Sequence, residues 1–388
     1  MGHSLKNLKN VKNMTNLKTI MITLMMLACL ISIPVSFAEE TAAAEKTITD
    51  GYGRSVTVPV PASEVLCSGS GCLRYLTYLG GEDLIVGVDS IEKEPQVMDA
   101  RGYALLNPEF KDYPLFGEFR GKDDPEKIIA IGPQLVFKTG STGTPFATNA
   151  EEGNKLTEKT GIPVIMFPYG SLRTQTEQDE MFGALRVMGE VINKEDRAEE
   201  LISYIEDTIA DLEKRTGDIP EAEQKTAYVG GVSYAGAHGI ISTEPSYPPF
   251  IWTNVKNAAG KMGTQHADVA KEAIVDWDPE YIFMDVGTLQ ADSEGGIGEL
   301  KDDPALQGLS AISEGKVYGV LPYNFYNTNY ENVLADAYFI GKTIYPDRFA
   351  DIDPKEKADE IMTMFLGESP LDKINSQYKN LGFSQITL

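Results

Sequence analysis

Residues 124–137 have the sequence Asp124-Pro125-Glu126-Lys127-Ile128-Ile129-Ala130-Ile131-Gly132-Pro133-Gln134-Leu135-Val136-Phe137. The start Asp124-Pro125-Glu126 predicts a short helix over Lys127–Ile131, and the apolar run within Gln134–Phe137 predicts a buried strand. A helix that leads directly into a buried strand is the unit from which parallel sheets of α/β proteins are built. We therefore expect an α/β fold around this segment.

The alternation of strands and helices extends to both sides of this segment. Thr47–Pro59 predicts a hairpin, because two alternating strands flank a Gly-rich turn. The other predicted elements of this half are the strands Glu64–Cys67, Leu84–Val88 and Pro163–Phe167 and the helices Leu73–Leu79 and Asn154–Thr160. This order predicts a parallel sheet with helices on both of its faces.

Helix-favouring residues fill Glu177–Arg215 and interrupt the alternation. In the second part of this segment apolar residues recur at helical spacing, and Asn193 is predicted as the helix N-cap. The alternation then resumes with the predicted strands Thr226–Val229, Tyr281–Asp285 and Val317–Val320 and the predicted helices Asn254–Ala259, Tyr330–Ile344 and Lys355–Phe365. We expect an N-terminal α/β lobe over 47–173, a helical segment over 174–215 and a C-terminal α/β lobe over 216–388.

The charge of the chain excludes several classes of partner. The 388 residues include 34 Lys and Arg against 58 Asp and Glu, a formal net charge of -24. Four of the lysines and none of the acids lie in residues 1–38, so the remainder carries -28. Such an acidic surface repels polyphosphate and anionic lipid, which argues against a general nucleic-acid or membrane-surface binder. The length is large for a single core, so two domains are expected.

The N-terminal residues 1–38 are predicted to be a secretory signal peptide. Scattered lysines precede the apolar run Ile20–Phe37, and Ser36-Phe37-Ala38 places small residues before a cleavage point. Met14 is an alternative to Met1 as the true start. Two alternatives to cleavage are an uncleaved membrane anchor and lipidation at Cys29. In each case the protein is exported and works at the outer face of the cytoplasmic membrane or in the periplasm.

Export affects the interpretation of Cys67 and Cys72, the two cysteines that follow the signal. A pair of cysteines in an exported protein can form a disulfide, and two buried thiols are the alternative. A metal site at this pair would need further ligands, and no His or Cys lies nearby in the sequence.

The chain matches three motifs of nucleotide binding and catalysis only in part. In Gly69-Ser70-Gly71-Cys72-Leu73-Arg74 the third glycine of a dinucleotide fingerprint is replaced by Arg74. Gly341-Lys342-Thr343 resembles the end of a phosphate loop, but it lies inside a predicted helix. A Ser/His/Asp hydrolase would have only His238 and His266 as bases, and the chain has no Gly-x-Ser-x-Gly elbow. We therefore expect a binding protein rather than an enzyme.

Polar and aromatic residues follow the predicted strands at their carboxyl ends, where ligands bind in open α/β sheets. The aromatic and amide side chains of Tyr323–Tyr330 suit a large, flat, partly polar ligand. Core packing is the alternative for any single aromatic residue, and His238 alone is more often a surface residue than a metal ligand. The predicted ligand-binding residues are Ser68, Gly69, Arg120, Lys138, Thr139, Tyr169, Tyr234, His238, Trp252, Tyr323, Asn324, Phe325 and Tyr326.

The chain resembles the substrate-binding proteins of ABC importers for iron-siderophores, haem and vitamin B12. The resemblance covers residues 47–350 and rests on the order and spacing of individually weak matches. These matches are Ile48–Pro59, Leu79-Gly80, Ile85–Val88, Asp124–Val136, Trp277–Phe283 and Gly315–Tyr318. The resemblance implies two Rossmann-like lobes bridged by a long rigid α-helix, with the ligand cleft between them. Asn193–Arg215 fits that helix, and its rigidity implies that the lobes close only slightly.

The resemblance also implies a docking role for two acidic residues. Proteins of this family carry a glutamate at the tip of each lobe that pairs with arginines of the membrane permease. Glu126 and Glu272 match these positions, and both are expected near a helix start, where an exposed carboxylate is stable. The alternative is that both are ordinary surface acids.

The ligand is the less specific part of this prediction. Arg120 and Lys138, with Arg74 as a further candidate, are cations near the cleft of a very acidic protein, which suits an anionic ferric chelate or haem propionates. A corrinoid is the alternative, because Tyr323–Tyr330 would also suit it. Free Zn or Mn is disfavoured, because the chain has only three histidines. A different class of function, an exported enzyme that uses the same cleft, stays the distant alternative.

Together these features predict an extracytoplasmic receptor that binds an iron(III) chelate, either a siderophore or haem, and delivers it to an ABC permease with its cytoplasmic ATPase. We expect a monomer that catalyses no reaction, needs no cofactor, provides no metal site of its own and binds no nucleic acid.

Overall fold

Two parallel sheets are the main elements of the computed structural model, which describes residues 43–94, 96–140, 149–168, 170–291 and 294–388. The chain divides into the units Met1–Ala42 and Ala43–Leu388, and the first lies wholly outside the described residues. The predicted signal peptide, the alternative start Met14 and Cys29 therefore fall outside the described part, as does Tyr169. No helix of the described residues is both long enough and apolar enough to cross a membrane.

The first sheet has six strands in the order β6-β5-β4-β3-β7-β8. All neighbours are parallel except β5 and β6. The strands are β3 (Val65–Ser68), β4 (Ile85–Asp89), β5 (Leu115–Glu118), β6 (Lys122–Asp123), β7 (Leu135–Gly140) and β8 (Val164–Pro168). Every residue of β3, β7 and β8 is buried, as expected for strands covered on both faces.

The second sheet has five strands in the order β11-β9-β13-β14-β15. Only β15 is antiparallel to its neighbour. The strands are β9 (Thr226–Gly230), β11 (Lys256–Asn257), β13 (Tyr281–Asp285), β14 (Val317–Val320) and β15 (Ser384–Gln385). Two short ribbons complete the strands: β1 (Ala44–Thr49) pairs with β2 (Ser55–Val60), and β10 (Ser242–Thr243) pairs with β12 (Ala267–Asp268).

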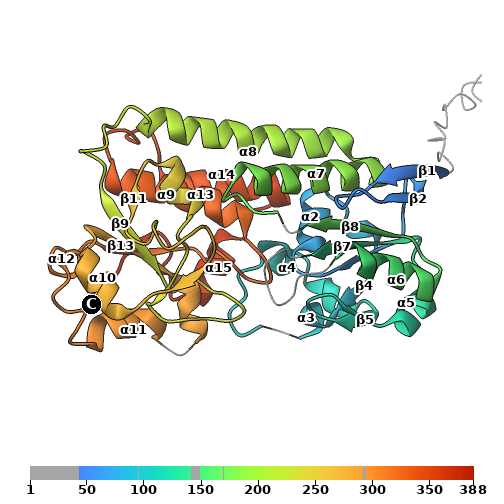
Figure 1. Cartoon of the computed structure of the whole chain (residues 1–388), viewed down its shortest axis with the longest axis horizontal. Coiled ribbons are helices and arrows are strands. Elements are labelled where there is room, and N and C mark those ends of the chain that lie inside the picture. Colours follow the sequence, from blue (N-terminus) through green and yellow to red (C-terminus); the bar gives the residue numbers. More distant parts are fainter. Residues whose placement is uncertain (1–42, 95, 141–148, 169, 292–293) are drawn as a thin grey trace, which may run out of the picture. The chain divides into compact units, whose positions relative to one another are not determined.

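Helices pack around both sheets (Figure 1). The α-helices of the first half are α2 (Cys72–Tyr78), α3 (Ser90–Lys93), α4 (Gly102–Leu106), α5 (Pro125–Ile131) and α6 (Ala150–Thr160). Those that follow are α7 (Gln175–Ile192), α8 (Glu195–Thr216), α9 (Pro248–Trp252), α10 (Lys271–Trp277), α11 (Gly295–Asp302), α12 (Ser310–Ser313), α13 (Tyr330–Ile344), α14 (Pro354–Leu366) and α15 (Leu371–Gln377). Three 3₁₀ turns are η1 (Glu82–Leu84), η2 (Pro108–Asp112) and η3 (Val286–Gln290). This arrangement confirms the predicted α/β class.

The helical segment between the sheets consists of two helices, α7 and α8. Asn193, predicted as the N-cap of the long helix, instead ends α7 in the left-handed conformation at φ 58°. Asparagine tolerates this conformation better than most residues, so the chain turns there and α8 begins at Glu195. Figure 1 shows α7 and α8 side by side, and the buried residues of α8 recur with the predicted helical spacing.

One further predicted element is wrong. Residues 254–259 form no helix, because Asn254 has a φ of 55° and Lys256–Asn257 pair with β9 as β11. The helix of this region is α9, which lies just before it. The C-terminal helices, by contrast, fall where apolar periodicity predicts them, in α13 and α14.

A single buried apolar cluster joins elements of both halves. It includes Tyr75 and Tyr78 of α2, Leu201 of α8, Tyr330 of α13 and Phe365 of α14. The Tyr75 and Tyr330 rings stack with their centroids 5.8 Å apart. The Tyr78 ring packs edge-on against Phe365 with a centroid distance of 4.9 Å. The two sheets are thus held by a shared aromatic core as well as by the chain connections.

Candidate functional site

The main candidate site is a pocket of about 270 Å³ that lies beyond the carboxyl ends of strands from both sheets. Ser70 follows β3 and Arg120 follows β5, while Ser233 follows β9 and Tyr323 follows β14. Parallel strands present their carboxyl ends at one edge of a sheet, which is where ligands bind in this class of fold. The complete lining is Ser70, Ile91, Phe119, Arg120, Arg173, Glu177, Ser233, Tyr234, Ala235, Gly236, Glu244, Gln265, His266, Gln290 and 323–328.

Several of the predicted ligand-binding residues line this pocket. They are Arg120, Tyr234, Tyr323, Asn324, Phe325 and Tyr326. The others that the structure describes lie outside the lining, namely Ser68, Gly69, Lys138, Thr139, His238 and Trp252.

Lys138 is occupied by neighbouring groups of the first sheet. Its ammonium pairs with Asp123 at 2.7 Å and donates to the Gly121 carbonyl at 2.9 Å and to the Ser68 hydroxyl at 3.1 Å. The side chain is almost fully buried, and Ser68 in turn donates to Asp123 at 2.5 Å. A buried ammonium with a carboxylate and two further acceptors is neutralised where it stands, so Lys138 of β7 serves the packing of the first sheet through Asp123.

Gly69 and Thr139 support the loop that carries Ser70 to the pocket. Gly69 has a φ of +87°, and a Cβ at this position would lie 2.5 Å from the Thr139 carbonyl oxygen. The Thr139 hydroxyl donates to the Ser70 carbonyl at 2.8 Å. Trp252 is buried in the core at the end of α9. His238 lies beside the site, with its Nε2 at 2.7 Å from the Tyr234 carbonyl.

Arg120 reaches across the pocket from the first half of the chain to the second. Its backbone has a φ of 63°, and its N–H donates to the Tyr326 hydroxyl at 2.8 Å. The guanidinium lies over the Phe119 ring at 4.8 Å and donates to the Ala235 carbonyl at 3.4 Å. A partly exposed guanidinium beside aromatic rings is well suited to bind an anionic, flat ligand.

A second arginine of the pocket, Arg173, is absent from the sequence predictions. It directly precedes Thr174, the N-cap of α7, and its guanidinium pairs with Glu177 at 2.6 Å. It also donates to the Gln265 amide oxygen at 3.1 Å and lies 3.7 Å from the Glu244 carboxylate. Burial opposes its charge, but the surrounding Tyr323, Glu177 and Glu244 raise the pKa of Arg173 above its ordinary value. Its place shortly after the end of β8 is the signal that could have identified it.

Glu244 and Ser233 present buried polar atoms to the pocket. Burial raises the pKa of Glu244 to about 7, although Arg173 lowers it. Within the described part of the chain, neither Glu244 Oε1 nor Ser233 Oγ has a hydrogen-bond partner. A buried polar atom without a partner costs free energy, so both atoms are positioned to accept or donate a hydrogen bond when a ligand enters.

His266 forms part of the pocket wall. Its Nε2 lies 2.7 Å from Ser242 Oγ, and that hydroxyl donates its single proton to the Val232 carbonyl at 2.6 Å. Ser242 must therefore accept from His266, so Nε2 carries a proton. Burial lowers the pKa of His266, and its ring stacks on Tyr234 at 4.2 Å. The β10–β12 pairing places this histidine near Glu244.

Arg74, a further candidate cation, is instead a structural residue below the pocket. It is fully buried in α2 and donates to the Thr328 carbonyl at 2.8 Å, the Phe325 carbonyl at 3.0 Å and the Asn329 amide oxygen at 2.6 Å. These three bonds join the first half of the chain to the aromatic loop 323–329. The side chains of that loop are therefore positioned before a ligand binds.

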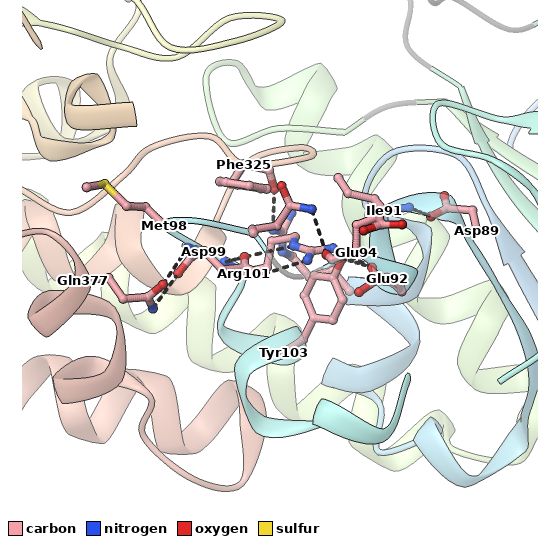
Figure 2. A network of polar contacts seen from close by, with 12 residues as sticks. Asp89, Ile91, Glu92, Glu94, Met98, Asp99, Arg101, Tyr103, Phe325 and Gln377 are labelled. Atoms are coloured by element: carbon pink, nitrogen blue, oxygen red, sulfur yellow. Dashed lines mark hydrogen bonds and ion pairs between the residues drawn. The ribbon is translucent and has the colours of Figure 1, made fainter. Parts of the chain in front are cut away.

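A buried ionic network supports the same loop from the side (Figure 2). Arg101 pairs with Glu92 at 2.8 Å and with Asp99 at 2.7 Å, and its guanidinium lies 5.4 Å from the Phe325 ring centroid. Gln377 of α15 accepts the Asp99 backbone N–H at 2.8 Å, which links the network to the C-terminal half. Each charge in this network has a partner of opposite sign, as burial requires.

Cys67 and Cys72 are both buried free thiols in the structure. Burial, with the neighbouring Cys72 as a further cause, raises the pKa of Cys67 well above its ordinary value. The geometry corresponds to the alternative of two buried thiols rather than to a disulfide. In the described ranges, no group of three or more His, Cys, Asp and Glu side chains is arranged to hold a metal ion.

The two glutamates with a predicted docking role occupy equivalent positions. Glu126 is the second residue of α5 and Glu272 the second residue of α10, and both side chains are exposed. Within the described residues neither carboxylate has an ion-pair partner.

Comparisons with known proteins agree with this architecture. Residues 65–323 match the family model described as periplasmic binding protein. The molybdate-binding protein MolA of Haemophilus influenzae is 22% identical over 350 residues, which cover 85% of this chain and 92% of that protein. Its molybdate-bound structure has a TM-score of 0.66 at 20% identity and covers 84% of this chain and 98% of its own. The structure of the petrobactin-binding protein YclQ of Bacillus subtilis has a TM-score of 0.55 at 17% identity. The match covers 79% of this chain and 99% of the YclQ chain.

Proposed function

Because the chain belongs to the periplasmic binding protein family, we propose that it is the extracytoplasmic receptor of an ABC importer, and that its ligand is a compact anionic iron(III) chelate. The receptor binds this chelate in the pocket between the strand ends and delivers it to the permease, which works with a cytoplasmic ATPase. It catalyses no reaction itself. Its place of action is outside the cytoplasmic membrane, after export directed by residues 1–38.

The observation that carries this proposal is the composition of the pocket wall. The Arg120 guanidinium lines it together with the rings of Phe119, Tyr234 and Phe325, while the second guanidinium of the wall, Arg173, pairs with Glu177. Cations attract an anionic complex, and aromatic faces bind the flat organic groups of a chelator. A site of this kind recognises the ligand around the metal rather than the metal alone.

The size of the pocket favours a small chelate over haem or a corrinoid. Its volume of about 270 Å³ lies just below the range of about 300–1,000 Å³ typical of pockets for drug-sized ligands. Haem and cobalamin have large planar macrocycles that would need the aromatic loop to move. Arg74 and Arg101 hold that loop, so an opening of this kind would break buried hydrogen bonds.

A molybdate-like oxyanion is the second candidate. It is favoured by the similarity to MolA, whose name and bound ligand are molybdate. An oxyanion could accept hydrogen bonds from Arg120 and Ser233. It would make less use of the aromatic rings that line the pocket, which is why the chelate is preferred.

A titration followed by intrinsic Trp and Tyr fluorescence tests the proposal. The purified protein is titrated with ferric complexes of small catecholate, hydroxamate and carboxylate chelators, with haem, with cobalamin and with sodium molybdate. We expect micromolar or tighter quenching by at least one small ferric complex and none by the iron-free chelator. Binding of molybdate alone would support the oxyanion, whereas binding of none of these compounds would reject the ligand assignment. Visible absorbance of the loaded protein gives an independent readout.

A further inference from the structure

Two segments of the chain, 125–137 and 271–283, share the same features at the same positions. Each has glutamate second (Glu126, Glu272), a fully buried isoleucine fourth (Ile128, Ile274) and proline ninth (Pro133, Pro279). Each ends in phenylalanine (Phe137, Phe283) within a buried strand. The first segment contains α5 and the first half of β7, and the second contains α10 and most of β13. The two segments are therefore equivalent helix–strand units, one from each sheet.

The backbone of the two segments agrees as well. Both α5 and α10 have 7 residues, and both end in a left-handed residue, Gly132 at φ 72° and Asp278 at φ 38°. Both helices lead into a strand with parallel neighbours on each side, β7 between β3 and β8 and β13 between β9 and β14. The same register along each helix therefore places the same positions on the solvent side.

At the fifth position of each segment an aliphatic residue is exposed to solvent. Ile129 is 52% exposed and Val275 is 38% exposed. Each follows its exposed glutamate by three residues, so carboxylate and aliphatic side chain lie on one face of the helix. Large apolar side chains with this exposure are few among the described residues, the others being Val97, Ile251 and Met262. Figure 1 shows α5 and α10 on the side of residues 43–388 that lies away from α8.

We propose that Ile129 and Val275 are the apolar half of two equivalent docking patches for the permease dimer. This inference rests on the proposed function, because it takes the permease as the partner. Each patch, Glu126 with Ile129 or Glu272 with Val275, offers the same charge and the same apolar contact. The matching surface is one basic residue beside one apolar residue, present twice. A partner made of two identical subunits provides this surface.

The pairing of charge with an aliphatic neighbour has a physical reason. An exposed ion pair contributes little, because water screens it. An apolar contact beside the pair excludes water from it, so the same charges attract each other more strongly. Glu126 and Glu272 have no ion-pair partner among the described residues, which leaves both carboxylates available for such a contact.

The test measures association of the ligand-loaded receptor with the purified importer complex in nanodiscs. The variant I129Q/V275Q removes the apolar contacts and keeps good helix formers in α5 and α10. Its matched control is I251Q/M262Q, since these side chains are 51% and 50% exposed and lie outside the two segments. The variant E126A/E272A serves as the reference for the charged half. Ligand affinity and melting temperature are measured for every variant.

We expect I129Q/V275Q to weaken association about tenfold, with ligand affinity and melting temperature unchanged, and the control to stay within about twofold of the native protein. Native association by I129Q/V275Q, or an equal loss in the control, would overturn the inference. If E126A/E272A alone weakens association, the apolar half is wrong and the proposed function stands. If the native receptor itself does not bind the importer complex, the proposed function fails.

Discussion

The Tyr326 hydroxyl donates a hydrogen bond to the Asp89 carboxylate, and so joins the loop after β14 to the end of β4. The same hydroxyl accepts the backbone N–H of Arg120 at 2.8 Å. One phenol therefore positions both a pocket arginine and a buried acid. Burial raises the pKa of Asp89 to about 7, although the bond from Tyr326 lowers it.

Tyr326→Phe should destabilise the protein, and more so at pH 8 than at pH 6. Asp89 has a native pKa above its unfolded value, so its contribution to stability is full below about pH 4 and is lost as the pH rises through 7. Without the hydroxyl, the ionised carboxylate at pH 8 loses a donor, and the cost should be about 1–3 kcal/mol. Thermal melts at both pH values measure it.

The control for this prediction is Tyr113→Phe, which removes a hydroxyl with no hydrogen-bond partner in the described residues. It should change the melting temperature little at either pH. An equal loss at pH 6 and pH 8 in Tyr326→Phe would mean that Asp89 does not titrate in this range.

Glu244→Gln should remove a pH dependence of ligand binding. The pKa of Glu244 is about 7, so a negative charge appears in the pocket between pH 6 and pH 8 and weakens the binding of an anionic ligand. The native affinity should fall by about tenfold over this range, while Arg173 stays charged. The variant should match the native protein at pH 6 and bind more tightly at pH 8.

Titration calorimetry with the ligand identified by fluorescence quenching measures this effect, and Glu223→Gln in an exposed loop is the matched control. A native-like pH slope in Glu244→Gln would show that another group is responsible. A fall in the affinity of the variant at pH 6 would indicate that the carboxyl group itself contacts the ligand in a way that the amide cannot replace.

The double variant Glu126→Ala with Glu272→Ala should bind the ligand with native affinity and transport it poorly. Both side chains are exposed on α5 and α10 and lie outside the pocket lining. Loss of two carboxylate–arginine contacts should reduce uptake by about tenfold or more. Uptake of the labelled ligand in cells checks this prediction, with Glu223→Ala and Glu368→Ala as exposed controls. Weaker ligand binding in the double variant would contradict the docking role.

Cys67 and Cys72 should both react as free thiols once the protein is unfolded. Both are buried, and burial keeps the pKa of Cys67 high, so alkylation of the native protein should be slow. Mass spectrometry after alkylation in denaturant, without reductant, should find both residues modified. A tryptic peptide that retains a Cys67–Cys72 crosslink would show that the exported protein is oxidised.

Much of the fold is predictable because local patterns and burial agree. The buried runs of β7 and β8 and the apolar, helix-favouring segment of α13 are strong signals, and the structure has these elements at the predicted places. Asn193 and Asn254 show the limit. Both adopt positive φ, which asparagine permits but does not require. The sequence therefore predicts the helix boundary at Asn193 but not that Asn193 caps the preceding helix, and it predicts a helix from Asn254 that the structure does not have.

The candidate site is less predictable, because a charged residue near a strand end can serve the pocket or the core. Lys138 directly follows β7 in the predicted scheme, but Asp123 neutralises it inside the sheet. Arg173 and Glu244 lie far apart in sequence and meet through α7 and the β10–β12 pairing. This contact depends on the tertiary fold, so no local sequence pattern predicts it.

The equivalence of the helix–strand units around α5 and α10 has a kinetic consequence. If each unit presents the same surface, a receptor turned by half a revolution presents the same pair of contacts to a two-fold symmetric permease. Docking in either of the two orientations would then lead to transport. Few diffusional encounters would be wasted on the wrong orientation, and the path of the ligand into the translocation channel would be the same from either one.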